Sequence, residues 1–413
     1  MSKDKKTICW LSDSTTLPTG YATMTLNILN GLSKDYDCHQ LAHNFTGQTL
    51  VPPIKFEDGS SINFKLHGNG MRPYYEDLIG VKLKELDADV FVTLLDTFMV
   101  TPFFPNYNFG KAKTIFYFPS DGGSGIPLGC ENVLKKMDIP IAMAKFGQKQ
   151  VEDMYGIKCR YIPHGVDSKM FHPLSIEEKL KLRQKFHLVD KFVIGVVARN
   201  QGRKMLDRTL KAFKLFIDKA PDAVLLLHCD PNDPAAIFPM QKMIERYKLQ
   251  NRVLFTGMKY YKGFTYKEMN NVYNLFDVFL LTTSGEGFGV PLIEAMSCEI
   301  PIIATDYTTT REIVIDHNAG LPINLVGTTK EENPWVHENE ILNGTLTGGW
   351  MVERGICDVK HCADQLKLLY DNPNMLKEMG KNGRKAVLKE YDWDLIIPQW
   401  KEVMEELTRL WVK

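Results

Sequence analysis

The sequence predicts an α/β protein of two doubly wound domains that face each other across a cleft. Two observations support this fold class. Short, almost continuously apolar segments alternate with helical patterns along the chain, and the alternation occurs in both halves. Strands that are apolar on both faces are typical of parallel sheets covered by helices on both sides. A length of 413 residues is enough for two such domains.

The individual elements follow from the same patterns. Four segments of the first half are predicted to be buried strands: 7–12 (TICWLS), 89–95 (DVFVTLL), 113–118 (KTIFYF) and 139–144 (IPIAMA). Five strands are predicted in the second half, at 192–198, 223–228, 252–257, 277–281 and 301–305. Helical patterns lie between them at 21–32, 145–155, 205–218, 266–275 and 290–297.

A proline- and glycine-containing segment marks the boundary between the halves. The segment 161–173 (YIPHGVDSKMFHP) precedes a charged helix at 176–186, so a hinge is predicted over residues 164–190. We expect a first domain over residues 1–165 and a second over 166–390. In the last segment, 391–413, apolar residues recur at helical spacing. This helix is predicted to pack back on the first domain, with contact to a membrane surface or a partner as the alternative.

Composition excludes several classes of protein. The formal net charge is zero, which gives no reason to expect a nucleic-acid partner. The eight cysteines occur singly with no CxxC pair, so buried, reduced thiols are expected and a metal site is not. No segment has the roughly 18–20 apolar residues of a membrane span, and the amino terminus lacks the features of a signal peptide. A soluble, cytoplasmic protein is therefore expected.

The most informative segment is SGEGFGVPLIEAM, residues 284–296. It follows a predicted strand and begins a helix, which is where ligands bind in open parallel sheets. Its three glycines allow the backbone to approach a ligand closely, and the amino terminus of the helix near Val290 favours an anion such as a diphosphate. Glu286 lies in the loop and Glu294 lies further along the helix. A glutamate among glycines at a strand end is poorly explained by packing alone.

A second segment, VARNQGRKMLDRTLKAF (197–213), places Arg199 and Lys204 in another strand-to-helix loop. A departing nucleoside diphosphate gains negative charge, and fixed cations stabilise it. Arg203 lies between them and is either a third cation of the site or a solvated surface charge.

These motifs resemble those of the retaining, family-4-type glycosyltransferases of the GT-B fold, the glycosyl transferases of group 1. The resemblance covers residues 160–320 well and the first 150 residues loosely. It implies two Rossmann-like domains and a metal-independent enzyme with no cofactor besides its nucleotide-sugar substrate. It also assigns roles to particular residues. Glu286 approaches the donor sugar, Glu294 binds the nucleotide ribose, and Arg199 and Lys204 hold the diphosphate. The backbone at Phe288 and Gly289 contacts the donor, and Gly20 belongs to a first-domain loop that closes over it.

The chain departs from the family in the first domain. Many members have a histidine in a loop near the reacting centre, whereas the equivalent segment here, 116–127 (FYFPSDGGSGIP), has Asp121. Asp121 is expected either to orient an acceptor hydroxyl or to cap a turn. His164 in the hinge is expected to be structural. The polar segment 327–350 is either a loop over the acceptor side or a surface insertion.

The predicted function is transfer of a hexosyl group from a nucleotide-diphosphate sugar to an acceptor hydroxyl, with retention of anomeric configuration. Glu286, Arg199, Lys204 and Asp121 are the candidate catalytic residues, and Gly20, Phe288, Gly289 and Glu294 the candidate donor-binding residues. The acceptor is a saccharide, a lipid-linked sugar or a small molecule, and peripheral contact with a membrane is possible. The alternatives are a nucleotide-sugar epimerase or a phosphorylase on the same fold, and a catalytically silent nucleotide-sugar-binding protein.

Overall fold

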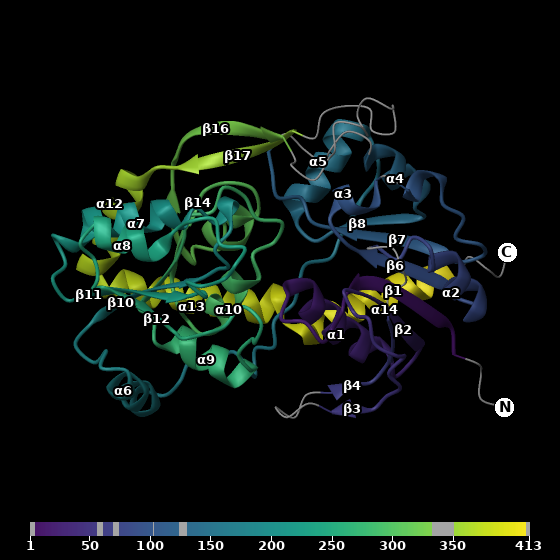
Figure 1. Ribbon diagram of the computed structural model, residues 1–413, viewed down its shortest axis with the longest axis horizontal. Coiled ribbons are helices and arrows are strands. Elements are labelled where there is room, and N and C mark those ends of the chain that lie inside the picture. Colours follow the sequence, from purple (N-terminus) through teal and green to yellow (C-terminus); the bar gives the residue numbers. More distant parts are fainter. Residues whose placement is uncertain are drawn as a thin grey trace.

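The computed structural model describes residues 5–55, 61–68, 74–101, 103–123, 130–332 and 351–409. Over these residues the chain forms two parallel sheets, each covered by helices (Figure 1). In both sheets the first strand of the domain lies inside the sheet and later strands are added on either side of it. This is the doubly wound arrangement that the sequence predicts.

The first sheet has seven strands in the order β5-β2-β1-β6-β7-β8-β9, and every neighbouring pair is parallel. Their bounds are β1 Thr7–Asp13, β2 Asp37–His43, β5 Lys65–Gly68, β6 Val90–Leu94, β7 Lys113–Phe118, β8 Ile139–Ala142 and β9 Arg160–Tyr161. A separate two-stranded ribbon pairs β3 (Ile54–Lys55) with β4 (Ser61–Ile62). The helices of this half are α1 Gly20–Leu32, α2 Ile79–Glu85, α3 Thr97–Val100, α4 Cys130–Lys136 and α5 Lys145–Tyr155.

The second sheet has six strands in the order β12-β11-β10-β13-β14-β15, again parallel throughout. The strands are β10 Phe192–Val197, β11 Ala223–His228, β12 Val253–Phe255, β13 Val278–Leu281, β14 Ile302–Thr305 and β15 Gly320–Ile323. Its helices are α6 Ile176–Lys185, α7 Leu206–Ile217, α8 Met240–Arg246, α9 Tyr266–Asn274, α10 Val290–Ser297, α12 Val359–Asp371 and α13 Pro373–Ala386. The first sheet thus ends at Tyr161 and the second begins at Phe192. The expected domain boundaries at 165 and 390 stay predictions.

Local sequence explains where several helices begin. In α6 and α9, Ser175 and Thr265 are N-cap residues, and the glutamate three positions later completes a capping box in each case. Both helices therefore start where side chains accept hydrogen bonds from backbone amides that have no partner within the helix. All eight cysteines are buried and free, as the sequence predicts.

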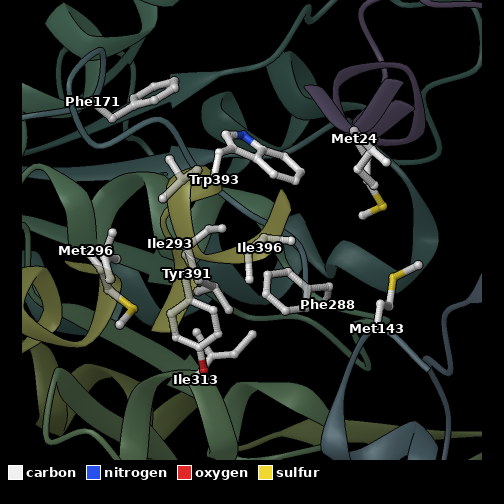
Figure 2. Packing of buried hydrophobic residues seen from close by; sticks show 14 of the residues in the cluster. Met24, Met143, Phe171, Phe288, Ile293, Met296, Ile313, Tyr391, Trp393 and Ile396 are labelled. Carbon is white, nitrogen blue, oxygen red and sulfur yellow. The ribbon is translucent and has the colours of Figure 1, made fainter. Parts of the chain in front are cut away.

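The final helix, α14 (Trp393–Arg409), crosses from the second half of the chain to the first (Figure 1). Its Trp400 is fully buried and packs edge-on against Trp10 of β1 and Tyr117 of β7, with ring centroids 5.1 and 4.9 Å away. One cluster of buried apolar residues runs from β1 and α1 through α14 to α10. Figure 2 shows its middle, where Trp393, Ile396 and Phe288 lie between the two halves. The helix therefore ties the two sheets to a shared core. Leu410, part of the predicted apolar stripe, lies outside the described residues.

An antiparallel hairpin extends from the second domain toward the first (Figure 1). It pairs β16 (Leu325–Glu332) with β17 (Met351–Cys357). The predicted polar segment 327–350 thus begins inside a strand, and its residues 333–350 lie outside the described residues.

Candidate functional site

The site lies where the carboxyl ends of the two sheets face each other. The loop after β7 contacts the loop after β13 so closely that a Cβ atom added to Gly285 would lie 1.9 Å from the backbone oxygen of Asp121. Only glycine fits at this point. The loop after β1 approaches the same region, because Gly20 lies next to Val290, the first residue of α10.

Glu286 is the centre of a buried ionic cluster. Its Oε1 lies 2.6 Å from Lys204 Nζ, and its Oε2 lies 2.9 Å from an Nη of Arg203. The side chains of Glu286 and Lys204 are 4% and 9% exposed, so solvent screens their interaction weakly. Arg203 also donates to the backbone oxygen of Gly285 at 3.2 Å. The loops after β10 and β13 are thereby locked to each other.

The backbone of Glu286 is fixed as firmly as its carboxylate. Its N–H donates to Thr308 Oγ1 at 2.9 Å, and its backbone oxygen accepts from the hydroxyls of Thr308 and Thr309, both at 3.1 Å. These threonines lie in the segment that follows β14. Glu286, which itself follows β13, is therefore held in place by the segments after two other strands, β10 and β14.

The charged groups of this cluster shift each other's pKa values. Burial by itself would raise the pKa of Glu286, but the positive charges of Arg203 and Lys204 outweigh it and lower that pKa to about 2. Burial, followed by repulsion from Arg203, lowers the pKa of Lys204 to about 8 despite the carboxylate. Glu286 is consequently a carboxylate at neutral pH and accepts hydrogen bonds only.

Three of the predicted donor-binding residues lie together at the start of α10. Gly289 is the N-cap residue, with φ at +94°, and no side chain caps the helix. The Phe288 ring is buried and stacks on His164, with centroids 5.7 Å apart, while its backbone oxygen accepts from Thr309. Gly20 lies across from the first turn. The uncapped amino terminus of α10 therefore faces the junction of the two domains.

Arg199 does not belong to this cluster. Its guanidinium pairs with Asp233, Nε to Oδ2 at 2.7 Å, and its side chain is 55% exposed. Arg199 and Lys204 were both expected to hold the diphosphate. The structure places Lys204 with Arg203 around Glu286 and Arg199 beside Asp233, and the diphosphate role of Arg199 stays a prediction. The reason for this placement is the short 3₁₀ turn Gly202–Lys204, which places two consecutive side chains toward Glu286 and leaves Arg199 at the rim.

Asp121 lies at the opposite side of the same junction. Its Oδ2 is 3.2 Å from an Nη of Arg354 and 4.0 Å from Nε of Arg203. Its backbone oxygen also accepts from Arg354 at 2.7 Å. The structure thus brings Asp121 to the Glu286 cluster and places two guanidinium groups beside it, one from the turn after β10 and one from strand β17.

Glu294 lies deeper in the second domain. Its Oε2 accepts a 2.5 Å hydrogen bond from Tyr273 of α9. Burial raises the pKa of Glu294 to about 7, and the bond from Tyr273 only partly offsets this effect. The two glutamates of the motif therefore lie in opposite environments. Neighbouring cations keep Glu286 ionised, whereas burial brings the pKa of Glu294 close to neutral pH.

The sequence analysis missed a second acidic group of the first domain. Asp96 follows β6 after Leu95, and its Oδ1 accepts a 2.6 Å hydrogen bond from the hydroxyl of Tyr21 in α1. Burial, reinforced by Asp121 and Asp13, raises the pKa of Asp96 to about 6 against the opposing effects of Tyr21 and Arg203. The signal was available, because an aspartate just after a buried parallel strand lies at the ligand-binding edge.

Comparisons with known proteins agree with this geometry. Residues 178–324 match the sequence model of a family described as glycosyl transferases group 1. The chain is 25% identical over 183 residues to mannosylfructose-phosphate synthase of Agrobacterium fabrum, covering 42% of this chain and 38% of that protein. It is 27% identical over 225 residues to a capsular polysaccharide biosynthesis glycosyltransferase of Staphylococcus aureus, covering 54% and 48%. The matched regions thus span less than half of these two relatives.

Solved structures match over nearly the whole chain. Sucrose-phosphate synthase of Thermosynechococcus elongatus has a TM-score of 0.75 at 16% identity, covering 98% of this chain and all of that one. The Anabaena protein HepE in complex with UDP-glucose has a TM-score of 0.69 at 14% identity, with coverages of 97% and 99%. The chain therefore has the two-domain GT-B fold. The segment 178–324, which matches the glycosyl transferases group 1 model, contains Lys204, Arg203, Glu286 and Glu294.

Two features are absent from the described residues. Among them, no helix combines the length and apolar character that crossing a bilayer requires. Within the same ranges, no three histidine, cysteine, aspartate or glutamate side chains gather as a potential metal site.

Proposed function

We propose that this chain is a retaining glycosyltransferase of the family-4 type, which transfers a hexosyl group from a nucleotide-diphosphate sugar to an acceptor hydroxyl without a metal ion. The observation that carries the proposal is the Arg203–Glu286–Lys204 cluster beside the uncapped amino terminus of α10. Two cations and a helix terminus converge on one point, and a diphosphate is the donor group that such a point stabilises.

The leaving group would be stabilised from the second domain. As the glycosidic bond breaks, negative charge collects on the diphosphate, and Lys204, Arg203 and the amino terminus of α10 would lie beside it. Fixed positive charge of this kind favours the transition state more than the ground state. These two side chains and the helix terminus would take the part that a divalent metal plays in other transferases, so no metal is required. Arg199, held at the rim by Asp233, would contribute less.

Glu286 would position the sugar rather than exchange a proton. With its pKa lowered to about 2, it stays a carboxylate at physiological pH and accepts hydrogen bonds from sugar hydroxyls. Glu294 would accept from the ribose hydroxyls, as the family resemblance implies. The mechanism proposed is a front-side displacement. The acceptor oxygen attacks the anomeric carbon on the face from which the phosphate leaves, and a departing phosphate oxygen takes the acceptor proton.

The acceptor would approach from the first domain, where Asp121 and Asp96 lie. The chemistry of the site admits a saccharide, a lipid-linked sugar or a small molecule. Of the two relatives, one is named for the synthesis of mannosylfructose phosphate and the other for capsular polysaccharide biosynthesis. We propose a cytoplasmic enzyme that can reach a membrane-associated acceptor by peripheral contact.

The test is incubation of the protein with radiolabelled nucleotide sugars and mixed acceptors in the presence of EDTA, with the anomeric configuration of the product determined by NMR. Retained configuration in EDTA is the expected result. Glu286→Gln and Lys204→Ala should abolish most transfer, while Arg311→Ala, which removes a surface arginine paired with Asp306, should leave it unchanged. Full transfer by the Glu286 variant would show that the site is misassigned.

Other outcomes identify the alternatives. Turnover of the donor without acceptor would indicate an epimerase, and dependence on inorganic phosphate would indicate a phosphorylase. Donor binding without turnover would indicate a catalytically silent binding protein.

A further inference from the structure

The β16–β17 hairpin connects two loops of the site. One is the loop after β13 that carries Glu286, called here the donor loop, and the other is the first-domain loop after β7 that carries Asp121, called the acceptor-side loop. Its base is bonded to the donor loop, because the Gly355 N–H donates to the backbone oxygen of Ser284 at 2.9 Å. Two residues earlier, the backbone oxygen of Glu353 accepts from the N–H of Gly123 at 3.0 Å. Two residues of one strand, Gly355 and Glu353, thus hold the loops that follow β13 and β7.

The fit between the hairpin and the first-domain loop is tight. A Cβ atom on Gly122 would lie 2.1 Å from a methyl carbon of Val352 and 3.0 Å from the backbone oxygen of Glu353. Tyr307, in the segment after β14, completes the contact by donating from its hydroxyl to the Glu353 backbone oxygen at 3.1 Å. The hairpin is therefore seated on the first domain through shape and backbone hydrogen bonds.

Arg354 adds a specific contact with Asp121. One Nη lies 2.7 Å from the Asp121 backbone oxygen and 3.2 Å from Oδ2 of the same residue. A guanidinium that holds both the main chain and the carboxylate of one residue fixes its rotamer as well as its position. The Arg354 side chain is 13% exposed, which limits screening of the pair by solvent. By contrast, the Arg203 Nε lies 4.0 Å from the same carboxylate, at the outer limit of an ion pair.

We propose that Arg354 is a positioning residue for the transfer reaction, which aims the Asp121 carboxylate at the acceptor hydroxyl and couples that carboxylate to the donor loop. The inference rests on the proposed function and extends it to a residue beyond the matched segment 178–324. Because the same strand holds Ser284, acceptor side and donor side are aligned by one element. Arg354 acts through Asp121 and not on the diphosphate.

Kinetics of Arg354→Ala, Asp121→Asn and the double variant test this role. We expect Arg354→Ala to lower kcat/KM for the acceptor by about 10²-fold, as a 1 Å misplacement can do, with the KM for the donor unchanged. In the Asp121→Asn background the same substitution should have little further effect, because residues acting through one contact are not additive. Independent, multiplicative losses would overturn the proposal, and so would a raised donor KM. Arg354→Lys, which keeps the charge without the fork, should recover part of the loss, and Arg311→Ala is the matched control.

Hydrogen exchange gives a readout that does not depend on activity. Arg354→Ala should speed exchange in peptides covering residues 113–123, including the Gly123 amide, while peptides from β10 and β11 keep wild-type rates. Unchanged exchange at 113–123 would show that Arg354 does not hold the loop. If the wild-type protein transfers no sugar from any donor, the proposed function fails by itself, and the exchange data still decide whether Arg354 positions Asp121.

Discussion

The two arginines of the loop after β10 differ in what surrounds them. Arg203 contacts Glu286 and faces Asp121, whereas Arg199 is paired with Asp233 and half exposed. We therefore expect Arg203→Ala to lower kcat by about 10²-fold, the effect of removing one preorganised donor. Arg199→Ala should cost distinctly less. Steady-state kinetics with a saturating acceptor would measure both, and a larger loss for Arg199→Ala would contradict the assignment of the diphosphate cation.

The pKa of Lys204 predicts a pH dependence of activity. Burial and the neighbouring Arg203 lower that pKa to about 8, so the free protein loses this positive charge as the pH rises through that value. Because kcat/KM reports ionisations of the free enzyme, kcat/KM for the donor should fall above about pH 8. Lys204→Arg keeps its charge and should extend the plateau to higher pH. Identical falling limbs in the two proteins would exclude Lys204 as the titrating group.

Asp96 predicts a pH dependence of stability. Its pKa is raised by burial to about 6 from an unfolded value near 3.8, so between these values the folded state binds more protons than the unfolded state. Stability therefore falls as the pH rises through this window. Asp96→Asn should raise the melting temperature at pH 7 and flatten its change between pH 4 and 6, as measured by calorimetry at several pH values. A lower melting temperature at pH 7 would contradict a buried, destabilising carboxylate.

A sequence locates candidate site residues most readily where a residue type has few structural uses. The Glu286 loop and Lys204 could be predicted because glycines and a carboxylate at a strand end have few structural uses. The choice between Arg199 and Arg203 depends on the turn Gly202–Lys204, and its geometry is set by contacts with Ser284 and Glu286, 80 residues away or more. Arg354 could not be predicted because its partner, Asp121, is 233 residues distant in the sequence.

At the scale of elements, apolar strands were predictable and polar ones were not. The strand β2 (DCHQLAH) pairs with β1 inside the first sheet, yet its polar residues do not predict a buried strand. The structure satisfies its polar groups internally. His39 is hydrogen-bonded to His67 of β5 at 2.9 Å, and Gln40 donates to the Asp13 backbone at 2.7 Å. Such partners come from tertiary contacts, which a local pattern does not contain.

At the scale of elements, the close contact between the loops after β7 and β13 can be tested by adding a single methyl group. Gly285→Ala would place a carbon atom 1.9 Å from the Asp121 backbone oxygen, so the loops after β7 and β13 must separate. We expect a large loss of kcat, because Asp121 and Glu286 move apart, together with a lower melting temperature. Gly327→Ala is the control, since no heavy atom lies within 4 Å of its added carbon. Wild-type kcat in Gly285→Ala would show that the close approach is not needed for catalysis.

At the scale of the whole molecule, the GT-B fold places donor and acceptor chemistry on different sheets, so catalysis depends on how the sheets are held together. Over the described residues, the connections between the sheets include helix α14 with the shared core around its Trp393, the hairpin β16–β17, the contact of Gly285 with Asp121, and Glu312, which accepts hydrogen bonds from the amides of Lys145 and Phe146. Only α14 returns the end of the chain to the first sheet. It places Trp400 between Trp10 and Tyr117. Trp10 and Trp400 are 390 positions apart in the sequence.

Trp400 is accordingly the residue whose loss should uncouple the domains. Trp400→Ala removes a fully buried side chain from the shared core and should cost about 3–5 kcal/mol. The wild-type protein should unfold in one calorimetric transition, because one apolar cluster joins both sheets. In the variant, the first sheet loses its anchor to α14 while the second keeps its own core, so the transition should split, with the first domain melting earlier. Leu395→Ala, an exposed position of the same helix, should keep a single transition. One transition at a uniformly lower temperature in Trp400→Ala would show instead that the interface around Trp393 and Phe288 suffices to couple the domains.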